Sequence, residues 1–209
     1  MMRVPLIRKL AVALAGAMLV AGVATPASAQ CTPPKVVTMT IIAAASTSNS
    51  SINITGHAFL MFKNISSSAV KVGVVTLGSK DVISVGTWGN RRDGKGIYYN
   101  LERYYGASGF PGRVSYSVNL TAAELTKVNN YIKGNNHWSE VNNCAMFAKM
   151  TWYQVARPAP SAGTPVTVAG LVKGIKAISG YKTNIAIPSA TKGMVYRQDG
   201  SSGYHVAKI

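Results

Sequence analysis

The chain has 209 residues, of which 47% are hydrophobic, and its 22 Lys and Arg residues against six Asp and Glu give a formal net charge of +16. This length suits one domain with a substantial hydrophobic core. With only six carboxylates, and with two of the three histidines far from any acidic pair, the sequence argues against a His/Asp metal site. No phosphate-cradling glycine loop follows a predicted strand. We therefore expect neither a metal nor a cofactor.

The first 29 residues have the pattern of a secretory signal peptide. Their start is basic, residues 10–23 are apolar but too short to span a bilayer, and residues 27–29 form an Ala-x-Ala cleavage site. We expect cleavage after Ala29 and a secreted, extracellular domain of residues 30–209. A lipoprotein anchor on Cys31 is the alternative, but the residues before it fit the small-residue lipobox poorly. No later stretch is long and apolar enough for a membrane span.

The predicted mature domain stays strongly basic, because few of the basic residues lie in the leader. Such a charge attracts polyanions. For an exported protein we expect the partner to be an anionic cell-wall polymer, with peripheral contact to an anionic membrane as the alternative. We do not expect nucleic acid to be the partner. The charges form no basic run, so a role in solubility alone is the other interpretation.

The first half of the domain is predicted to form strands. Residues 36–45 are apolar and partly β-branched, and residues 54–62 are apolar on both faces, as in a strand inside a sheet. Residues 70–77 and 82–88 are rich in valine and follow after short connections, which predicts an antiparallel meander. Residues 114–118 form another predicted strand.

The second half is predicted to be mainly helical. Thr121-Ala122-Ala123-Glu124 is a capping box and opens a helix that ends at Gly134. A helix from Pro165 to a C-cap at Gly180 and a hairpin around residues 199–203 form a C-terminal extension. The predicted fold class is α+β, a single domain in which an antiparallel sheet packs against the helices.

Cys144 is the strongest candidate for chemistry. Asn143 is a good N-cap, so the helix that follows begins at Cys144, and the prolines at 158 and 160 end it. Unpaired backbone N–H groups and the helix dipole favour an anion there, so this thiol is expected to ionise readily and act as a nucleophile. The alternative is a disulfide with Cys31, although Cys31 lies in a Thr/Pro-rich terminus that is a poor anchor.

Two short motifs resemble a known superfamily. Gly56-His57-Ala58-Phe59 on a strand, followed much later by Asn143-Cys144-Ala145-Met146-Phe147-Ala148 at a helix start, is similar to the circularly permuted branch of the papain-like NlpC-type cysteine hydrolases. In that branch, as in the lecithin retinol acyltransferase group, the histidine strand precedes the cysteine helix. The resemblance covers the two motifs, their order and the strands between them, and leaves residues 156–209 unexplained. It implies a permuted papain-like fold with Cys144 as nucleophile and His57 as base.

The resemblance also implies a third polar residue that orients the histidine. The relatives often place a histidine about a dozen residues after the first, but that position here is Ala69. Asn90, Glu102 and Thr76 are the candidates in its place. We select Asn90, because an asparagine holds the histidine in papain-type sites.

His137 and His205 are the other two histidines, and we expect neither to be the base. His137 lies in a polar loop with nothing to fix its ring, and His205 lies in the tail.

These inferences predict a secreted cysteine amidase or peptidase that acts on peptide-containing cell-wall material. Acyl transfer or lipid-ester hydrolysis is the nearest variant, because an acyl-enzyme can pass its acyl group to another acceptor. A non-enzymatic exported protein that binds anionic wall polymer or membrane is the alternative from a different class. A secreted effector or toxin is the third candidate function.

Overall fold

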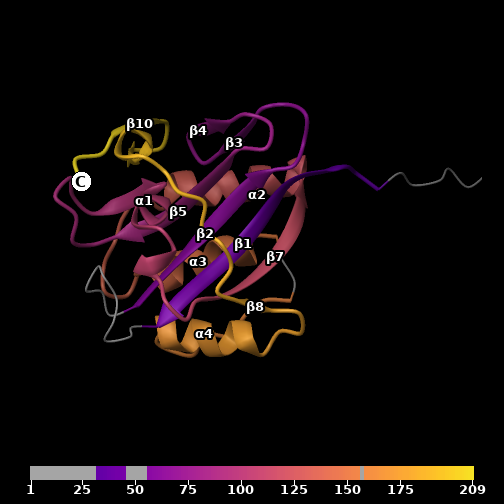
Figure 1. The fold of residues 1–209 in the computed structure, drawn as a ribbon, viewed down its shortest axis with the longest axis vertical. Coiled ribbons are helices and arrows are strands. Elements are labelled where there is room, and N and C mark those ends of the chain that lie inside the picture. Colours follow the sequence, from indigo (N-terminus) through magenta and orange to yellow (C-terminus); the bar gives the residue numbers. More distant parts are fainter. Residues whose placement is uncertain (1–31, 46–55, 156–157) are drawn as a thin grey trace, which may run out of the picture. The chain divides into compact units, whose positions relative to one another are not determined.

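An antiparallel sheet with eight strands among the described residues organises the fold (Figure 1). The computed structural model describes residues 32–45, 56–155 and 158–209, so the predicted leader, its cleavage site and Cys31 lie outside it. The strand order is β10-β9-β6-β5-β2-β1-β7-β8. The strands are β1 (Lys35–Ala45), β2 (Gly56–Asn64), β5 (Val82–Trp88), β6 (Gly96–Tyr99), β7 (Val114–Thr121), β8 (Lys182–Thr183), β9 (Tyr196–Asp199) and β10 (Gly203–Val206).

Helices and a long C-terminal segment cover the two faces of this sheet. The four α-helices of the described part are α1 (Leu101–Tyr105), α2 (Ala122–Gly134), α3 (Cys144–Tyr153) and α4 (Val168–Lys176). Helices α2, α3 and α4 pack on one face, where the larger core cluster lies. On the other face, α1 and the segment from 184 to 195 form a smaller cluster with Ile42, Phe59 and Phe110. Figure 1 shows this segment crossing the face opposite α3.

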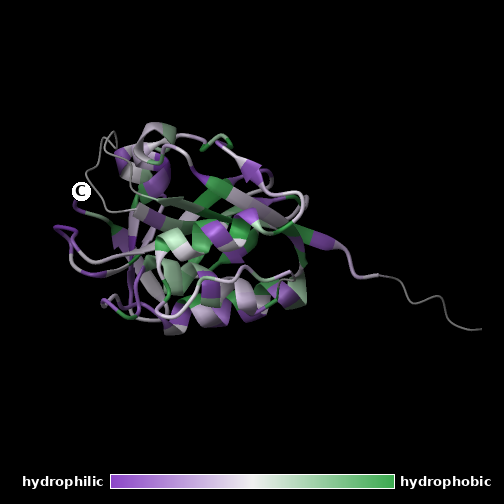
Figure 2. Ribbon diagram, turned by 90° about the horizontal axis from the view of Figure 1, so that it is seen from below, coloured by the Kyte–Doolittle hydropathy of each residue, from purple (hydrophilic) through white to green (hydrophobic). Residues whose placement is uncertain are grey.

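The central strands explain why both faces are covered. Strand β1 pairs with β2 from Val37–Asn64 to Ala45–Gly56, and its residues from Met39 to Ala44 are buried except for a small part of Thr40. Both faces of a strand that is apolar on both sides must be shielded from water. Figure 2 shows the hydrophobic residues gathered in these strands, with hydrophilic residues on the outer turns of the helices. The α+β class and the antiparallel sheet predicted from the sequence are confirmed.

Residues 70–77 do not form one strand of the meander, so that prediction is wrong. They form a separate hairpin of β3 (Val70–Val72) and β4 (Val75–Leu77). Gly73 makes the turn with a φ of +59°, and a Cβ there would lie 2.2 Å from the Tyr99 hydroxyl oxygen. A residue with a side chain would be strained and would clash, so glycine permits the turn.

The helix starts follow the capping signals. Thr121 accepts a hydrogen bond from the Glu124 N–H in the predicted capping box, and Asn143 accepts one from the Met146 N–H at the start of α3. Helix α4 begins later than predicted, because Thr167 caps it through the Gly170 N–H. Helix α1 was not predicted. Its five residues are too few for a helical periodicity to appear in the sequence.

Two buried arginines hold the C-terminal segment on the sheet. Arg103 donates to the carbonyl oxygens of Pro188 and Ser189, and Arg113 donates to that of Ile185. Burial lowers the pKa of both guanidinium groups. Arginine is not deprotonated in proteins, so each side chain is a buried cation. Backbone carbonyls therefore satisfy these charges, and the contacts fix the path of the segment.

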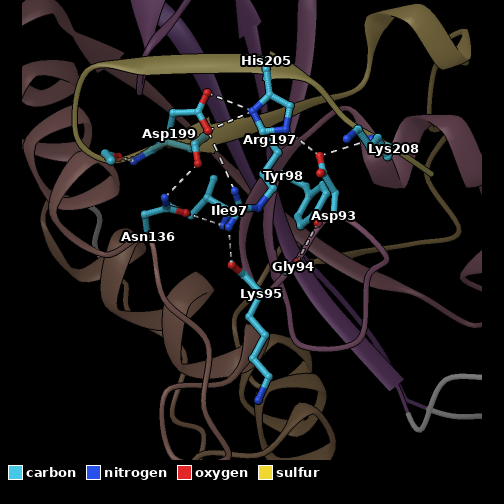
Figure 3. A network of polar contacts seen from close by, with 12 residues as sticks. Asp93, Gly94, Lys95, Ile97, Tyr98, Asn136, Arg197, Asp199, His205 and Lys208 are labelled. Carbon is cyan, nitrogen blue, oxygen red and sulfur yellow. Dashed lines mark hydrogen bonds and ion pairs between the residues drawn. The ribbon is translucent and has the colours of Figure 1, made fainter.

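The predicted tail hairpin is present as β9 and β10, and a polar network ties it to the loop between β5 and β6 (Figure 3). The His205 ring bridges two carboxylates, with Nδ1 at 2.9 Å from Asp199 and Nε2 at 2.6 Å from Asp93. These two carboxylates raise the pKa of His205. Arg197 donates to the Lys95 carbonyl at 3.1 Å. The network joins the C-terminal strands to a loop more than 100 residues earlier in the chain.

Within the described ranges, no helix combines the length and the apolar character needed to cross a membrane.

Candidate active site

The structure brings His57 and Cys144 into direct contact. His57 is the second residue of β2, and Cys144 is the first residue of α3, which packs against β2. Their side chains form a hydrogen bond. Nε2 of His57 faces Glu102, which leaves Nδ1 for the cysteine. Two residues far apart in the sequence thus form a cysteine–histidine pair.

Cys144 is a free, partly exposed thiol at the start of its helix. The backbone N–H groups of Ala58 and Ala145 hydrogen-bond to its sulfur atom. Ala58 can donate because the hydrogen-bonded ladder between β2 and β5 ends at Leu60–Val85, before the strand reaches Ala58. The cysteine therefore combines solvent access with three stabilising donors, which suits a thiolate nucleophile.

Glu102 holds the histidine from its other side. Its carboxylate is completely buried in the first turn of α1, and its Oε1 lies 2.9 Å from His57 Nε2. Two further groups donate to it, the Ser84 hydroxyl at 2.7 Å and the Trp88 indole N–H at 2.9 Å. With three donors around it, the carboxylate is well satisfied and is fixed in one orientation.

Aromatic rings fix the plane of the histidine. Trp88 lies against the His57 ring at 4.0 Å between centroids, and the rings of Phe59 and Phe110 lie at 5.8 Å. His57 is only 3% exposed. A buried ring with both nitrogen atoms bonded cannot turn freely, as required of a base that must stay aligned with its nucleophile.

The charges of the pair stabilise each other. Burial lowers the pKa of His57, but Cys144 and Glu102 outweigh it and raise the pKa to about 9. Burial raises the pKa of the Cys144 thiol, but His57 and the two backbone donors outweigh it and lower that pKa. The shifts in opposite directions favour a thiolate–imidazolium pair near neutral pH.

The structure places the third residue differently from the sequence-based selection. The side chain of Asn90 is exposed and accepts hydrogen bonds from Arg91, so it does not contact His57. Thr76 is also exposed, in β4 of the separate hairpin. Glu102 is the candidate that reaches the ring. Asn90 follows the end of β5 at Trp88, whereas Glu102 lies on helix α1, which packs against β5.

The other two histidines lie outside this constellation. His137 is exposed in the loop before α3, and His205 belongs to the network of the C-terminal hairpin.

Trp88 and Ser84 are the residues around the site that the sequence analysis missed. Together with Gly86, they lie at alternate positions of β5 and therefore share one face of the strand. One feature of the sequence could have identified Glu102 as a site residue. It is an acidic residue within an aromatic segment of a very basic chain.

No group of three or more His, Cys, Asp or Glu side chains in the described part could hold a metal ion. The arrangement at Cys144 instead suits attack on a carbonyl carbon, with a thiolate and an adjacent imidazolium at the positive end of a helix.

Gly86 permits the contact between His57 and Glu102, which leads to a first prediction. A Cβ at Gly86 would lie 2.2 Å from Glu102 Oε1 and 3.2 Å from His57 Nε2. We expect Gly86→Ala to displace the carboxylate and to slow turnover about 10²-fold, which is the low end of the contribution of a positioned acid–base group. Gly134→Ala is the matched control, because nothing lies within 4 Å of a Cβ there. A Gly86→Ala protein with wild-type turnover would show that the contact is unimportant.

Comparison with protein-family models, with curated proteins and with solved structures found no match.

Proposed function

We propose that the protein is a secreted cysteine hydrolase that cleaves an amide bond in peptide-containing cell-wall material. The observation that carries the proposal is the aligned series Cys144, His57 and Glu102, with Glu102 taking the place of the third residue in a triad. Such a series on unrelated scaffolds serves acyl transfer. The resemblance of the two motifs to permuted papain-like enzymes supports the same class.

In the proposed mechanism the Cys144 thiolate attacks the carbonyl carbon, a C–S bond forms, and the carbonyl π electrons move to oxygen. The backbone N–H of Cys144 and the positive end of the α3 dipole stabilise this oxyanion. The C–N bond then breaks, and the His57 imidazolium gives its proton to the leaving amine. Water, deprotonated by His57, hydrolyses the thioester and regenerates the thiolate. Glu102 keeps the ring in place through both steps.

Secretion and the wall substrate are supported by the sequence. The signal-peptide pattern would export the chain, and the strongly positive net charge of residues 30–209 would hold it near anionic wall polymer. The charge also favours a second candidate, an exported protein that binds such polymer without cleaving it.

The test is to incubate the mature protein with purified wall peptide material and to follow new amino groups by mass spectrometry. We expect release by the wild type and none by Cys144→Ala. Sedimentation of Cys144→Ala with the same material measures binding separately. Equal release by both proteins, or none by either, would contradict the hydrolase, and binding without release would favour the second candidate.

A further inference from the structure

Thr87 lies on the side of β5 that faces the helix of Cys144. Side chains alternate along a strand. Gly86 and Trp88 face Glu102 and His57, so Thr87 faces the opposite side, as do Ile83 and Val85. On that side Ile83 and Val85 pack in one cluster with residues of α3, and α3 packs against β5.

Continued beyond its last pair, the register of β2 and β5 brings Thr87 to the level of Ala58, whose N–H donates to the Cys144 sulfur atom. The last ladder pair is Leu60–Val85, and two residues further along each strand the register sets Ala58 opposite Thr87. The strands stay close there, because the His57 and Trp88 rings of the next pair lie 4.0 Å apart. The Ala58 N–H is one of the donors to Cys144, so Thr87 is the cross-strand neighbour of that donor.

The Thr87 hydroxyl has no hydrogen-bond partner. The residue is 1% exposed, and its Oγ1 is one of two buried side-chain atoms without a partner in the part of the chain that the structure describes. The other two buried threonines are satisfied, Thr40 by Ser117 and Thr151 by the Phe147 carbonyl. An unpaired buried hydroxyl costs about 1–3 kcal/mol, so its persistence requires an explanation.

We propose that Thr87 is a further catalytic residue, whose hydroxyl donates a hydrogen bond to the carbonyl oxygen that Cys144 attacks. This inference rests on the proposed function and names the side chain that meets the oxyanion. The hydroxyl gains its partner when the carbonyl π electrons move to oxygen, and loses it when the tetrahedral intermediate collapses and the C–N bond breaks. A donor whose acceptor belongs to the substrate has no partner in the ligand-free protein.

The segment that leads to Cys144 covers this donor. Asn136 accepts a hydrogen bond from the N–H of Ile97, the β6 residue that pairs with Thr87. The ring of Trp138 lies over Gly89, where a Cβ would approach it to 2.5 Å. Gly89 is the first residue after β5, two positions beyond Thr87. These two contacts place residues 136–138 beside this end of β5 and β6.

The experiment compares two reactions of Cys144 in the mature protein. Acylation by p-nitrophenyl acetate passes through an oxyanion, whereas alkylation by iodoacetamide does not. We expect Thr87→Val to lower the acylation rate about 10²-fold, as for removal of one oxyanion donor, and to leave alkylation unchanged. Thr87→Ser, which keeps the hydroxyl, should retain acylation. Thr40→Val, which removes a buried hydroxyl elsewhere in the sheet, is the matched control. Thr87→Val should not lower the melting temperature, since the hydroxyl it removes is unpaired.

Two results would overturn the role of Thr87 alone. Unchanged acylation in Thr87→Val would mean that the hydroxyl holds only a buried water. Equal losses of acylation and alkylation would indicate a structural role. A wild-type protein that is alkylated but never acylated would overturn the proposed function and this inference together, and that outcome appears before any variant is made.

Discussion

Replacing His57 with alanine should slow the alkylation of Cys144 near neutral pH by about tenfold or more. Without the imidazolium, the pKa of the thiol returns at least to its ordinary value of about 8.5, so only a few per cent is thiolate at pH 7. The pKa of Cys144 is lowered in the intact pair and that of His57 is raised to about 9. The wild-type rate should therefore level off at a lower pH than the rate of the variant. Iodoacetamide kinetics at several pH values measure the difference.

Hydrolysis should fall further than alkylation in the same variant. A positioned base contributes about 10²–10⁴-fold to turnover, in addition to the loss of thiolate. His137→Ala and His205→Ala are the controls, because neither ring contacts the site. If the rate and pH profile of His57→Ala matched the wild type, the pairing would be disproved, and Cys144 would be an ordinary, partly buried core cysteine.

Glu102→Gln should lower turnover by at least about tenfold and at most about 10⁴-fold, the latter being the loss seen when a triad carboxylate is made neutral. Glutamine has nearly the same shape, so it can still accept from His57 and Trp88 through its oxygen, while its NH₂ group faces the Ser84 hydroxyl. The change removes the negative charge, one of the causes that raise the pKa of His57. The pH range in which Cys144 is a thiolate and His57 is protonated should therefore become narrower, because the pKa of His57 falls. Iodoacetamide kinetics at several pH values measure this range.

Asn90→Ala distinguishes the two candidates for the third residue. Its side chain contacts Arg91 and not the histidine, so turnover should stay at the wild-type level. Glu102→Ala is less informative, because removal of one partner from a buried ion pair costs about 3–5 kcal/mol and would destabilise the fold. Full activity in Glu102→Gln together with a large loss in Asn90→Ala would show that Asn90, and not Glu102, orients His57.

The parts of the fold that depend on neighbouring residues could be predicted from the sequence. The capping box at Thr121 and the N-cap at Asn143 are hydrogen bonds between residues three apart. Strands β1 and β2 could be predicted because each is formed by a largely apolar run of residues. For the same reason Cys144 could be recognised as the first residue of a helix, and the motif around His57 could be placed on a strand.

Only the tertiary structure decided which polar residue reaches the histidine and which residue of β5 comes to the level of Ala58. Glu102 meets His57 across 45 positions, through a five-residue helix that has no periodic pattern of its own. Thr87 lies opposite Ala58 because of the register between β2 and β5, and a shift of one residue would turn it to the other face. Helix capping and hydrophobic periodicity depend on residues a few positions apart, so they can be recognised in the sequence. Strand register and packing depend on contacts between residues far apart in the chain. No local pattern in a single sequence reveals them.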